Sequence, residues 1–171
     1  MTEPAANHSS SGIEISDDQK YLYKIWHKWD AGPVACFCML NPAYPTDSHR
    51  DPIPMLCEKY ARAAGCGGIE IINLYARITS LMDVLRNGRD PVGPRNDQVI
   101  VESAKAAGMF IAAWGWVDMA RERIVVVERK LREADVSVLC LGTTMGGHPK
   151  FPVFAADDAR PVPYMHSKDL T

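Results

Sequence analysis

The sequence has 171 residues, of which 47% are hydrophobic and 23% are charged. This balance is typical of a soluble globular protein with one domain and a proper core. The formal net charge of −2 excludes nucleic-acid binding through bulk positive charge, so any such surface has to be a local basic patch. The first residues have no apolar core, so we expect them not to be a secretory signal. The apolar run 109–117 is too short to cross a bilayer, so we expect no membrane association.

Five cysteines are present, and their number is odd. Cys36, Cys38 and Cys140 fall in apolar segments that we expect to be buried strands, and reduced core thiols are typical of cytoplasmic proteins. No pair has the two-residue gap of a zinc knuckle. We therefore expect a cytoplasmic protein without a metal or cofactor. The alternative is that several thiols converge on a metal or cluster.

The chain begins with a stretch rich in Ala, Ser and Asn. We expect residues 1–15 to be a disordered tail and residues 16–171 to form a single domain. Residues 21–29 place Leu22, Ile25, Trp26 and Trp29 at helical spacing, which predicts a first helix. Residues 34–40 are apolar without a break and lie between Gly-Pro and Asn-Pro. This pattern predicts a strand buried on both faces.

Further apolar runs predict strands at 68–72, 109–114 and 136–141. Helical periodicity and capping residues predict helices at 55–64, 80–87, 94–107 and 118–134. The end of the chain is rich in proline and irregular, with Val162, Pro163 and Tyr164 against the domain. Alternating strands and helices predict a three-layer α/β/α sandwich with a short, mainly four-stranded parallel sheet. We expect it to be a monomer.

Polar or special residues follow each predicted strand: Asn41, Asn73, Trp114 with Gly115, and the loop of His148. Ligands bind outside the carboxyl ends of strands in open parallel sheets. Asn41-Pro42 alone could merely start a turn, but four such features at one edge favour a functional site.

The motifs of the sequence resemble DUF1643, a family of small bacterial and phage proteins of unknown function. The motifs are MLNP at 39–42, DP at 51–52, NLYA at 73–76, DPVGPRND at 90–97, AAWG at 112–115, CLG at 140–142 and GHPKFP at 147–152. The resemblance covers most of the chain. The sequence departs from the family pattern after Asp51-Pro52, where Ile-Pro-Met stands in place of the usual Thr-Ile-Arg.

The order of motifs is also similar to the uracil-DNA glycosylase superfamily. This similarity implies a short parallel sheet covered by helices and an enzyme that excises a flipped base. It implies that Asn41, before Pro42, positions the attacking water and that Asn73 reads the pyrimidine edge. It also implies that Trp114 belongs to the third strand-end motif and that His148 stabilises the departing base. An amide can only orient water, so His49, Asp47 or Asp51 in the same loop could supply a base.

The residue after Pro42 bears on the substrate. Uracil-specific enzymes carry a bulky tyrosine there, whereas this sequence has Ala43. The similarity then implies a pocket open to pyrimidines substituted at C5, although Tyr44 could still enter it. Alternatively, Ala43 is only a turn residue.

Low net charge leaves DNA contacts to a few side chains. Lys150, Arg50 and Arg77 are candidates for phosphate contacts, and Phe151 is a candidate for the wedge that enters the base stack. Phe151 could equally hold its loop on the core, and Arg77 could form a surface salt bridge.

These observations predict a DNA glycosylase that flips out and excises a modified or mismatched pyrimidine, with duplex DNA as partner. The base could carry a hydroxymethyl or glucosylated hydroxymethyl group, and the role could be anti-phage defence. The alternatives are an enzyme acting on free nucleotides or nucleosides in the same pocket, and a non-catalytic module that binds modified bases.

Overall fold

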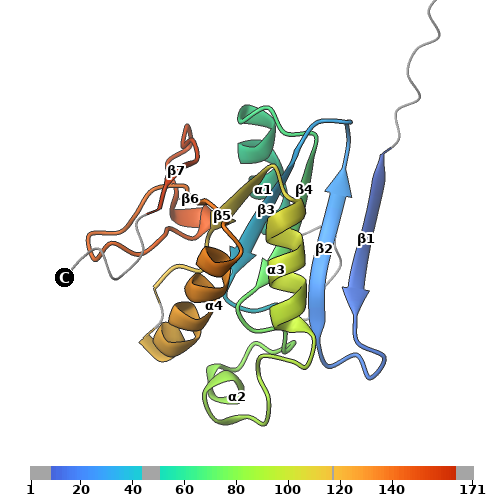
Figure 1. Ribbon diagram of the computed structural model, residues 1–171, viewed down its shortest axis with the longest axis vertical. Coiled ribbons are helices and arrows are strands. Elements are labelled where there is room, and N and C mark those ends of the chain that lie inside the picture. The colour runs from blue at the N-terminus through green and yellow to red at the C-terminus, as the bar shows by residue number, and fades with distance from the viewer. Residues whose placement is uncertain (1–8, 44–50, 117, 165–171) are drawn as a thin grey trace, which may run out of the picture.

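The fold is built on one seven-stranded mixed sheet, seen in a computed structural model that describes residues 9–43, 51–116 and 118–164 (Figure 1). The strands are β1 (Ser10–Ile15), β2 (Leu22–Lys28), β3 (Val34–Met39), β4 (Gly68–Asn73), β5 (Met109–Ala112), β6 (Val138–Cys140) and β7 (Val162–Pro163). Their order across the sheet is β1-β2-β4-β3-β5-β6-β7. The predicted strands are thus confirmed as β3 to β6, with some ends shifted.

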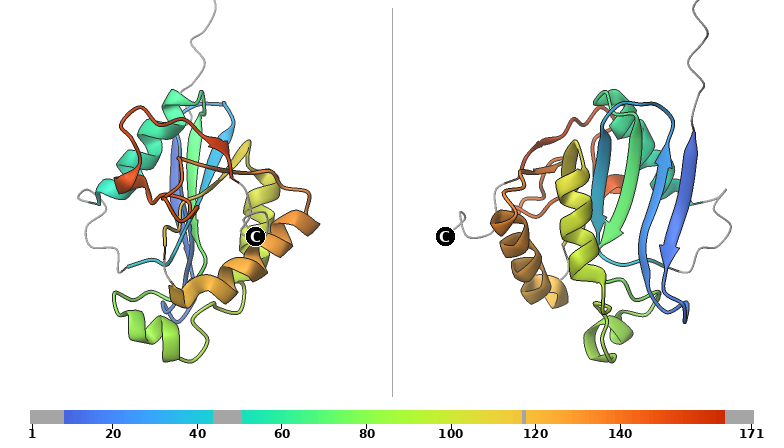
Figure 2. Two further views of the ribbon diagram at one scale, coloured as in Figure 1. Left: turned by 90° about the vertical axis from the view of Figure 1, so that its left-hand side faces the viewer. Right: turned by 45° about the vertical axis from the view of Figure 1, so that its right-hand side comes forward.

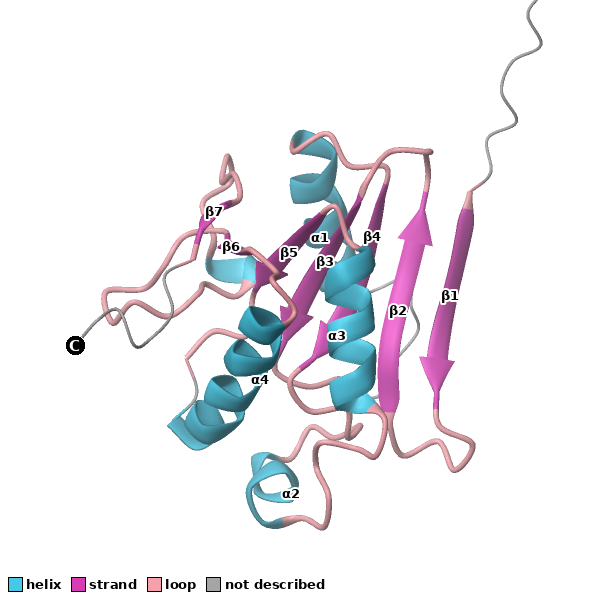
Figure 3. Ribbon diagram, in the orientation of Figure 1, coloured by secondary structure: helices cyan, strands magenta, loops and turns pink. Residues whose placement is uncertain are grey.

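The four central strands are parallel, and antiparallel strands extend the sheet on both sides (Figure 3). The expected sheet of mainly four parallel strands is therefore wrong as a description of the whole sheet, although it describes its centre. Buried, almost uninterrupted apolar runs form the central strands because helices cover both faces. All four central strands point their carboxyl ends to the same edge.

Helices lie on both faces of the sheet (Figure 2). They are α1 (Pro52–Ala63), α2 (Met82–Asn87), α3 (Asn96–Ala106) and α4 (Arg121–Glu133), with short 3-10 turns η1 (Asp118–Ala120) and η2 (Pro152–Phe154). One core lies under α1, around Phe37, Tyr60 and Ile111. The other lies under α3 and α4, around Phe110, Ile100 and Leu131. The predicted helices from residue 55 onwards are confirmed, with shifted ends.

The predicted helix at 21–29 is wrong, because these residues form β2. The pairing of β1 with β2 shifts register after Glu14, so that Ile13 faces Ile25 and Ile15 faces Leu22. This bulge places two β2 residues that are three apart on one face of the sheet, which imitates helical spacing. The aromatic and β-branched residues of this segment favour a strand.

The chain ends also differ from expectation. Ser10–Ile15, assigned to a disordered tail, pairs with β2 as an edge strand, whereas residues 1–8 lie outside the described residues. Near the other end, β7 pairs with β6, and Tyr164 is buried and meets Trp114 edge-on. The expectation that this segment lies against the domain is confirmed.

The five cysteines are buried free thiols, and burial raises the pKa of Cys38 to about 12. Among the described residues, no cluster of His, Cys, Asp and Glu has the makings of a metal site. No helix in the described part of the chain has the length and apolar character needed to span a membrane.

Candidate functional site at the carboxyl edge

A cavity of about 1660 Å³ runs from the carboxyl edge of the parallel strands along the face of β1, β2 and β4. The chain leaves β3 for β4 on one side and then crosses to β5 on the other side of β3. Such a switch point leaves a crevice between the carboxyl ends of the two neighbouring strands. The predicted site residues that line the cavity are Asn41, Pro42, Ala43, Asp51, Asn73, Trp114, Lys150 and Phe151.

Asn73 is the last residue of β4 and is only 4% exposed. Strand alternation places its side chain on the same face as Ile69 and Ile71, which also line the cavity. No described residue makes a hydrogen bond with its side-chain amide. The amide lines the cavity and is available there to a ligand as a donor and an acceptor.

Asn41 follows β3 and is partly buried. Its Nδ2 donates to the carbonyl oxygens of Thr79, at 2.7 Å, and Pro42, at 3.1 Å. Two carbonyl acceptors fix the orientation of the amide, because its oxygen could not replace the nitrogen there. The Oδ1 atom therefore remains as an acceptor that could hold a water molecule.

Asp51 has a structural task that sequence analysis did not assign. It caps the amino end of α1, and its Oδ1 accepts from the backbone N–H of Ile53 at 2.9 Å. Pro52 occupies the first turn, where a missing N–H does no harm. The Asp-Pro motif thus begins a helix at the rim of the cavity.

The Trp-Gly motif separates two tryptophans. Gly115 has a positive φ of 71°, a conformation that glycine adopts without strain. Trp114 borders the cavity, but its ring packs against Tyr164 in the core, with centroids 6.0 Å apart. Trp116 also lines the cavity and is 46% exposed. Trp116 was not among the predicted site residues, although a second tryptophan directly after the glycine was a visible signal.

His148 is not among the described residues that line the cavity. Its ring stacks on Trp116, with centroids 3.8 Å apart and planes tilted by 33°. Burial, followed by the positive charge of Arg121, lowers the pKa of His148, and Asp118 opposes this shift. The imidazole is therefore held at the rim of the cavity in a setting that favours its neutral form.

The predicted DNA-contacting residues occupy different places. Lys150 lines the cavity and makes no ion pair with a described residue. Phe151 and Phe154 both line the cavity, but Phe151 packs partly buried against the core under α1, whereas Phe154 is 74% exposed. Arg77 lies over the ring of Tyr21 at 5.7 Å and is not among the lining residues. Tyr44, Asp47, His49 and Arg50 fall outside the described residues.

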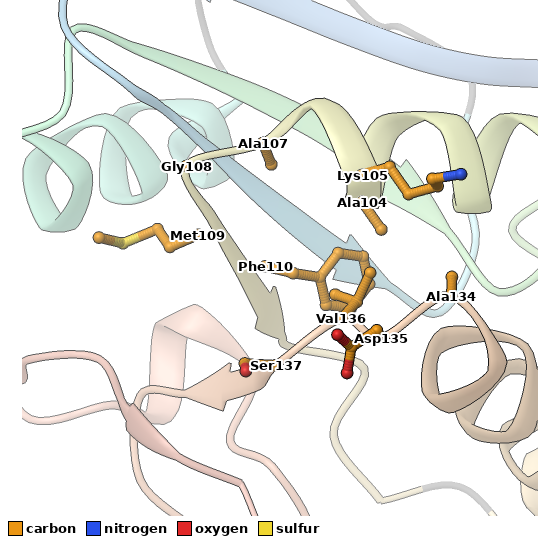
Figure 4. A pocket seen from close by; sticks show the side chains of 10 residues that line it. All are labelled: Ala104, Lys105, Ala107, Gly108, Met109, Phe110, Ala134, Asp135, Val136 and Ser137. Carbon is orange, nitrogen blue, oxygen red and sulfur yellow. The ribbon is translucent and has the colours of Figure 1, made fainter.

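The opposite edge of the sheet offers a smaller pocket of about 320 Å³ (Figure 4). Phe110 and Val136 lie among its apolar lining, and Lys105 and Asp135 are exposed beside them. None of the predicted site residues lines it. The carboxyl edge is therefore the better candidate for function.

Fold and cavity define a mixed α/β protein with a mostly apolar cavity, in which a few polar side chains lie at the switch point of the parallel strands. The sequence matches the family described as "Protein of unknown function (DUF1643)" over residues 22–153. The chain therefore belongs to this family, as its motifs predicted. No curated protein matches the sequence. The similarity to the uracil-DNA glycosylase superfamily stays a prediction.

Proposed function

We propose that the protein is a DNA glycosylase that flips a pyrimidine nucleotide out of the duplex and hydrolyses its N-glycosidic bond. The observation that carries this proposal is the amide of Asn73, which lines the cavity and has no hydrogen-bond partner among the described residues. An amide offers a donor and an acceptor side by side, which matches the hydrogen-bonding edge of a pyrimidine. A base seated against Asn73 would satisfy both groups.

The neighbouring groups suit the remaining steps. Asn41 Oδ1 accepts a hydrogen bond from water, which adds to the sugar carbon C1′ as the bond to the base breaks. The base leaves with the bonding electrons, and a neutral His148 donates a hydrogen bond to the developing negative charge. The proton that the added water loses ends on the departed base, so the products are a sugar hydroxyl and a neutral free base. Lys150, a cation at the cavity, suits a phosphate contact beside the flipped nucleotide.

The size of the cavity supports a substituted base. Pockets for small molecules usually measure about 300–1,000 Å³, and the volume of about 1660 Å³ here leaves space beyond a pyrimidine ring. Ala43 lines this cavity with a small side chain. The substrate we propose is therefore a pyrimidine modified at C5, such as a hydroxymethyl or glucosylated hydroxymethyl base, and a role in anti-phage defence would follow from such a substrate.

The wedge that enters the base stack is assigned to Phe154 rather than Phe151. Phe154 ends the short turn η2. The hydroxyl of Tyr60 in α1 lies 3.5 Å from the carbonyl oxygen of Pro152, at the start of η2, and 3.2 Å from that of Ala156, just after it. An ion pair between Lys59 and Asp157 adds to this anchor. A rigid, exposed aromatic ring beside a cavity is suited to fill the gap left by a flipped base.

A second candidate is an enzyme that acts on free nucleotides or nucleosides in the same cavity. Lys150 is the one lysine or arginine among the described residues that line the cavity. A single cation suffices for one phosphate but offers little to a duplex, whose binding depends on several phosphate contacts.

The test is single-turnover cleavage of duplexes that each carry one pyrimidine: uracil, thymine opposite guanine, 5-hydroxymethyluracil, 5-hydroxymethylcytosine or its glucosylated form. Alkali reveals abasic sites, and the variants Asn41→Ala and His148→Ala are compared with Asn87→Ala on the exposed surface of α2. We expect product from a 5-substituted base that only the first two variants reduce. Release of base from free nucleosides alone would favour the second candidate. Tight binding of one duplex without product would favour a non-catalytic binder.

A further inference from the structure

The segment that follows β4 connects the two asparagines of the site. Residues 74–79, which we call the β4 extension, continue from Asn73 along the carboxyl edge. The first two N–H groups of the β4 extension donate to the carbonyls of Met39 and Leu40, at 2.8 and 2.9 Å. Its last residue, Thr79, accepts from Nδ2 of Asn41 at 2.7 Å. A displacement at one end of the β4 extension should therefore change the positions of the side-chain amides of both Asn73 and Asn41.

Two side chains hold the start of the β4 extension from the face opposite the cavity. Asn96, fully buried in α3, donates from Nδ2 to the carbonyl oxygens of Asn73, at 3.0 Å, and Leu74, at 3.1 Å. Arg123 of α4 donates from Nε to the same Leu74 oxygen at 2.8 Å. Both peptide groups that follow Asn73 are thus fixed by side chains from distant parts of the chain.

Arg123 is itself held in place by charge. Its side chain is 8% exposed, and its guanidinium lies 2.6 Å from Oδ1 of Asp97. The ammonium of Lys130 lies 3.3 Å from the other oxygen of Asp97. Burial raises the pKa of Asp97, but the hydrogen bond and charge of Arg123, together with Lys130, outweigh it and lower the pKa. Asn96 and Asp97, neighbours in one family motif, therefore anchor the β4 extension by two routes.

The carbonyls of Asn73 and Leu74 need side-chain donors because of where they lie in the sheet. Regular pairing between β2 and β4 ends at the pair Ile25 and Ile71, so the carbonyls of Asn73 and Leu74 lie beyond it. Buried carbonyls need partners, and the Asn96 and Arg123 donors supply them where a strand does not. The backbone sets the direction of a side chain, so these bonds also set where the Asn73 amide lies in the cavity.

We propose that Asn96 and Arg123 are positioning residues, which hold the backbone of Asn73 so that its amide faces the cavity in the orientation that recognises a base. This inference rests on the proposed role of Asn73. Neither residue touches the cavity, and each acts through the two carbonyls that it binds. Misplacement of a site group by about 1 Å can lower a rate by about 100-fold.

The first test needs no substrate. Side-chain NH₂ resonances of 15N-labelled protein are recorded, and that of Asn73 is assigned by its loss in Asn73→Ala. We expect Asn96→Ala to shift or broaden the Asn73 resonance and, to a lesser extent, that of Asn41. The matched control is Gln98→Ala, because this exposed amide of α3 binds Glu102 on the surface and no other residue in the described ranges. If Asn96→Ala does not fold, Arg123→Lys is used, because it keeps the charge beside Asp97 and loses the Nε donor. An unchanged Asn73 resonance in the folded variant overturns the proposal.

The second test is a double-mutant cycle with Asn73→Ala and Asn96→Ala, read by single-turnover cleavage of a duplex with one 5-hydroxymethylcytosine. We expect Asn96→Ala to lower the rate by about 100-fold in the native background and to have little further effect once Asn73 is alanine. Equal effects in both backgrounds would mean a purely structural role. If the native protein cleaves no duplex, the proposed function fails, and the resonance of Asn73 still decides on positioning.

Discussion

The two asparagines at the carboxyl edge differ in how the fold uses their amides. Asn41 gives its NH₂ group to two backbone carbonyls and keeps only Oδ1 available. Asn73 is held by its backbone carbonyl, and its amide has no partner among the described residues. A fixed single acceptor suits the orientation of water, whereas an unpaired amide suits recognition of a base edge. The same residue type therefore serves two tasks. The stability and the activity of the Asn41→Ala and Asn73→Ala variants should show which asparagine serves which task.

The largest effect is expected for Asn73→Ala. Loss of a donor that meets the reacting base should lower kcat/KM by about 10²- to 10³-fold. The free energy of unfolding should stay nearly constant, because the amide has no hydrogen bond to a described residue that the variant would remove. Single-turnover cleavage and urea unfolding measure the two quantities, with Asn87→Ala as control. A large loss of stability would show that the Asn73 amide has a structural partner.

Asn41→Ala should show the opposite balance, with a clear loss of stability. The carbonyls of Thr79 and Pro42 would lose their donor, which should lower the free energy of unfolding by about 1–2 kcal/mol. Urea unfolding at constant pH measures this change. Asn87→Ala, which removes a surface bond to Asp83, should stay within about 0.5 kcal/mol. If Asn41→Ala is as stable as Asn87→Ala, the two amides do not differ as described.

The sequence predicted the centre of the sheet and eight of the residues that line the cavity. Long apolar runs that end at Asn41 and Asn73 mark buried parallel strands and their carboxyl ends, and this signal is local. The β2 strand was missed because a bulge disrupts the alternation of its side chains. The anchors of Asn73 were also missed, because Asn96 and Arg123 lie far along the chain and only the fold brings them to its carbonyl groups. Which amide is free and which is bound depends on such contacts and cannot be deduced from residue types.

Phe154, the proposed wedge, and Phe151 differ in exposure, so their alanine variants should differ in effect. Phe154→Ala should leave stability within about 0.5 kcal/mol and weaken duplex binding about tenfold, the loss expected from one apolar contact of about 1.5 kcal/mol. Release of base from a free nucleoside, if any, should not change. Phe151→Ala should instead lower the free energy of unfolding by about 2 kcal/mol, because this ring packs partly buried against the core. Fluorescence anisotropy with a labelled duplex measures the binding, and equal weakening by both variants would argue against Phe154 as the wedge.

The smallest effect concerns pH and the rim of the cavity. The pKa of His148 lies below its ordinary value of 6.5, through burial and then the charge of Arg121, with Asp118 opposing. As pH falls through 6.5, the unfolded chain therefore takes up a proton before the folded one, and stability begins to decrease. The neutral ring, and with it the cleavage rate, should persist until the lowered pKa is reached.

Arg121→Gln removes the positive charge beside His148 and should move the fall in rate to higher pH, toward 6.5. Arg132→Gln, an exposed site near the other end of α4, should leave it in place. NMR titration of the His148 ring checks the cause directly. A fall in rate that moves without a matching shift in the ring titration would assign the pH dependence to another group.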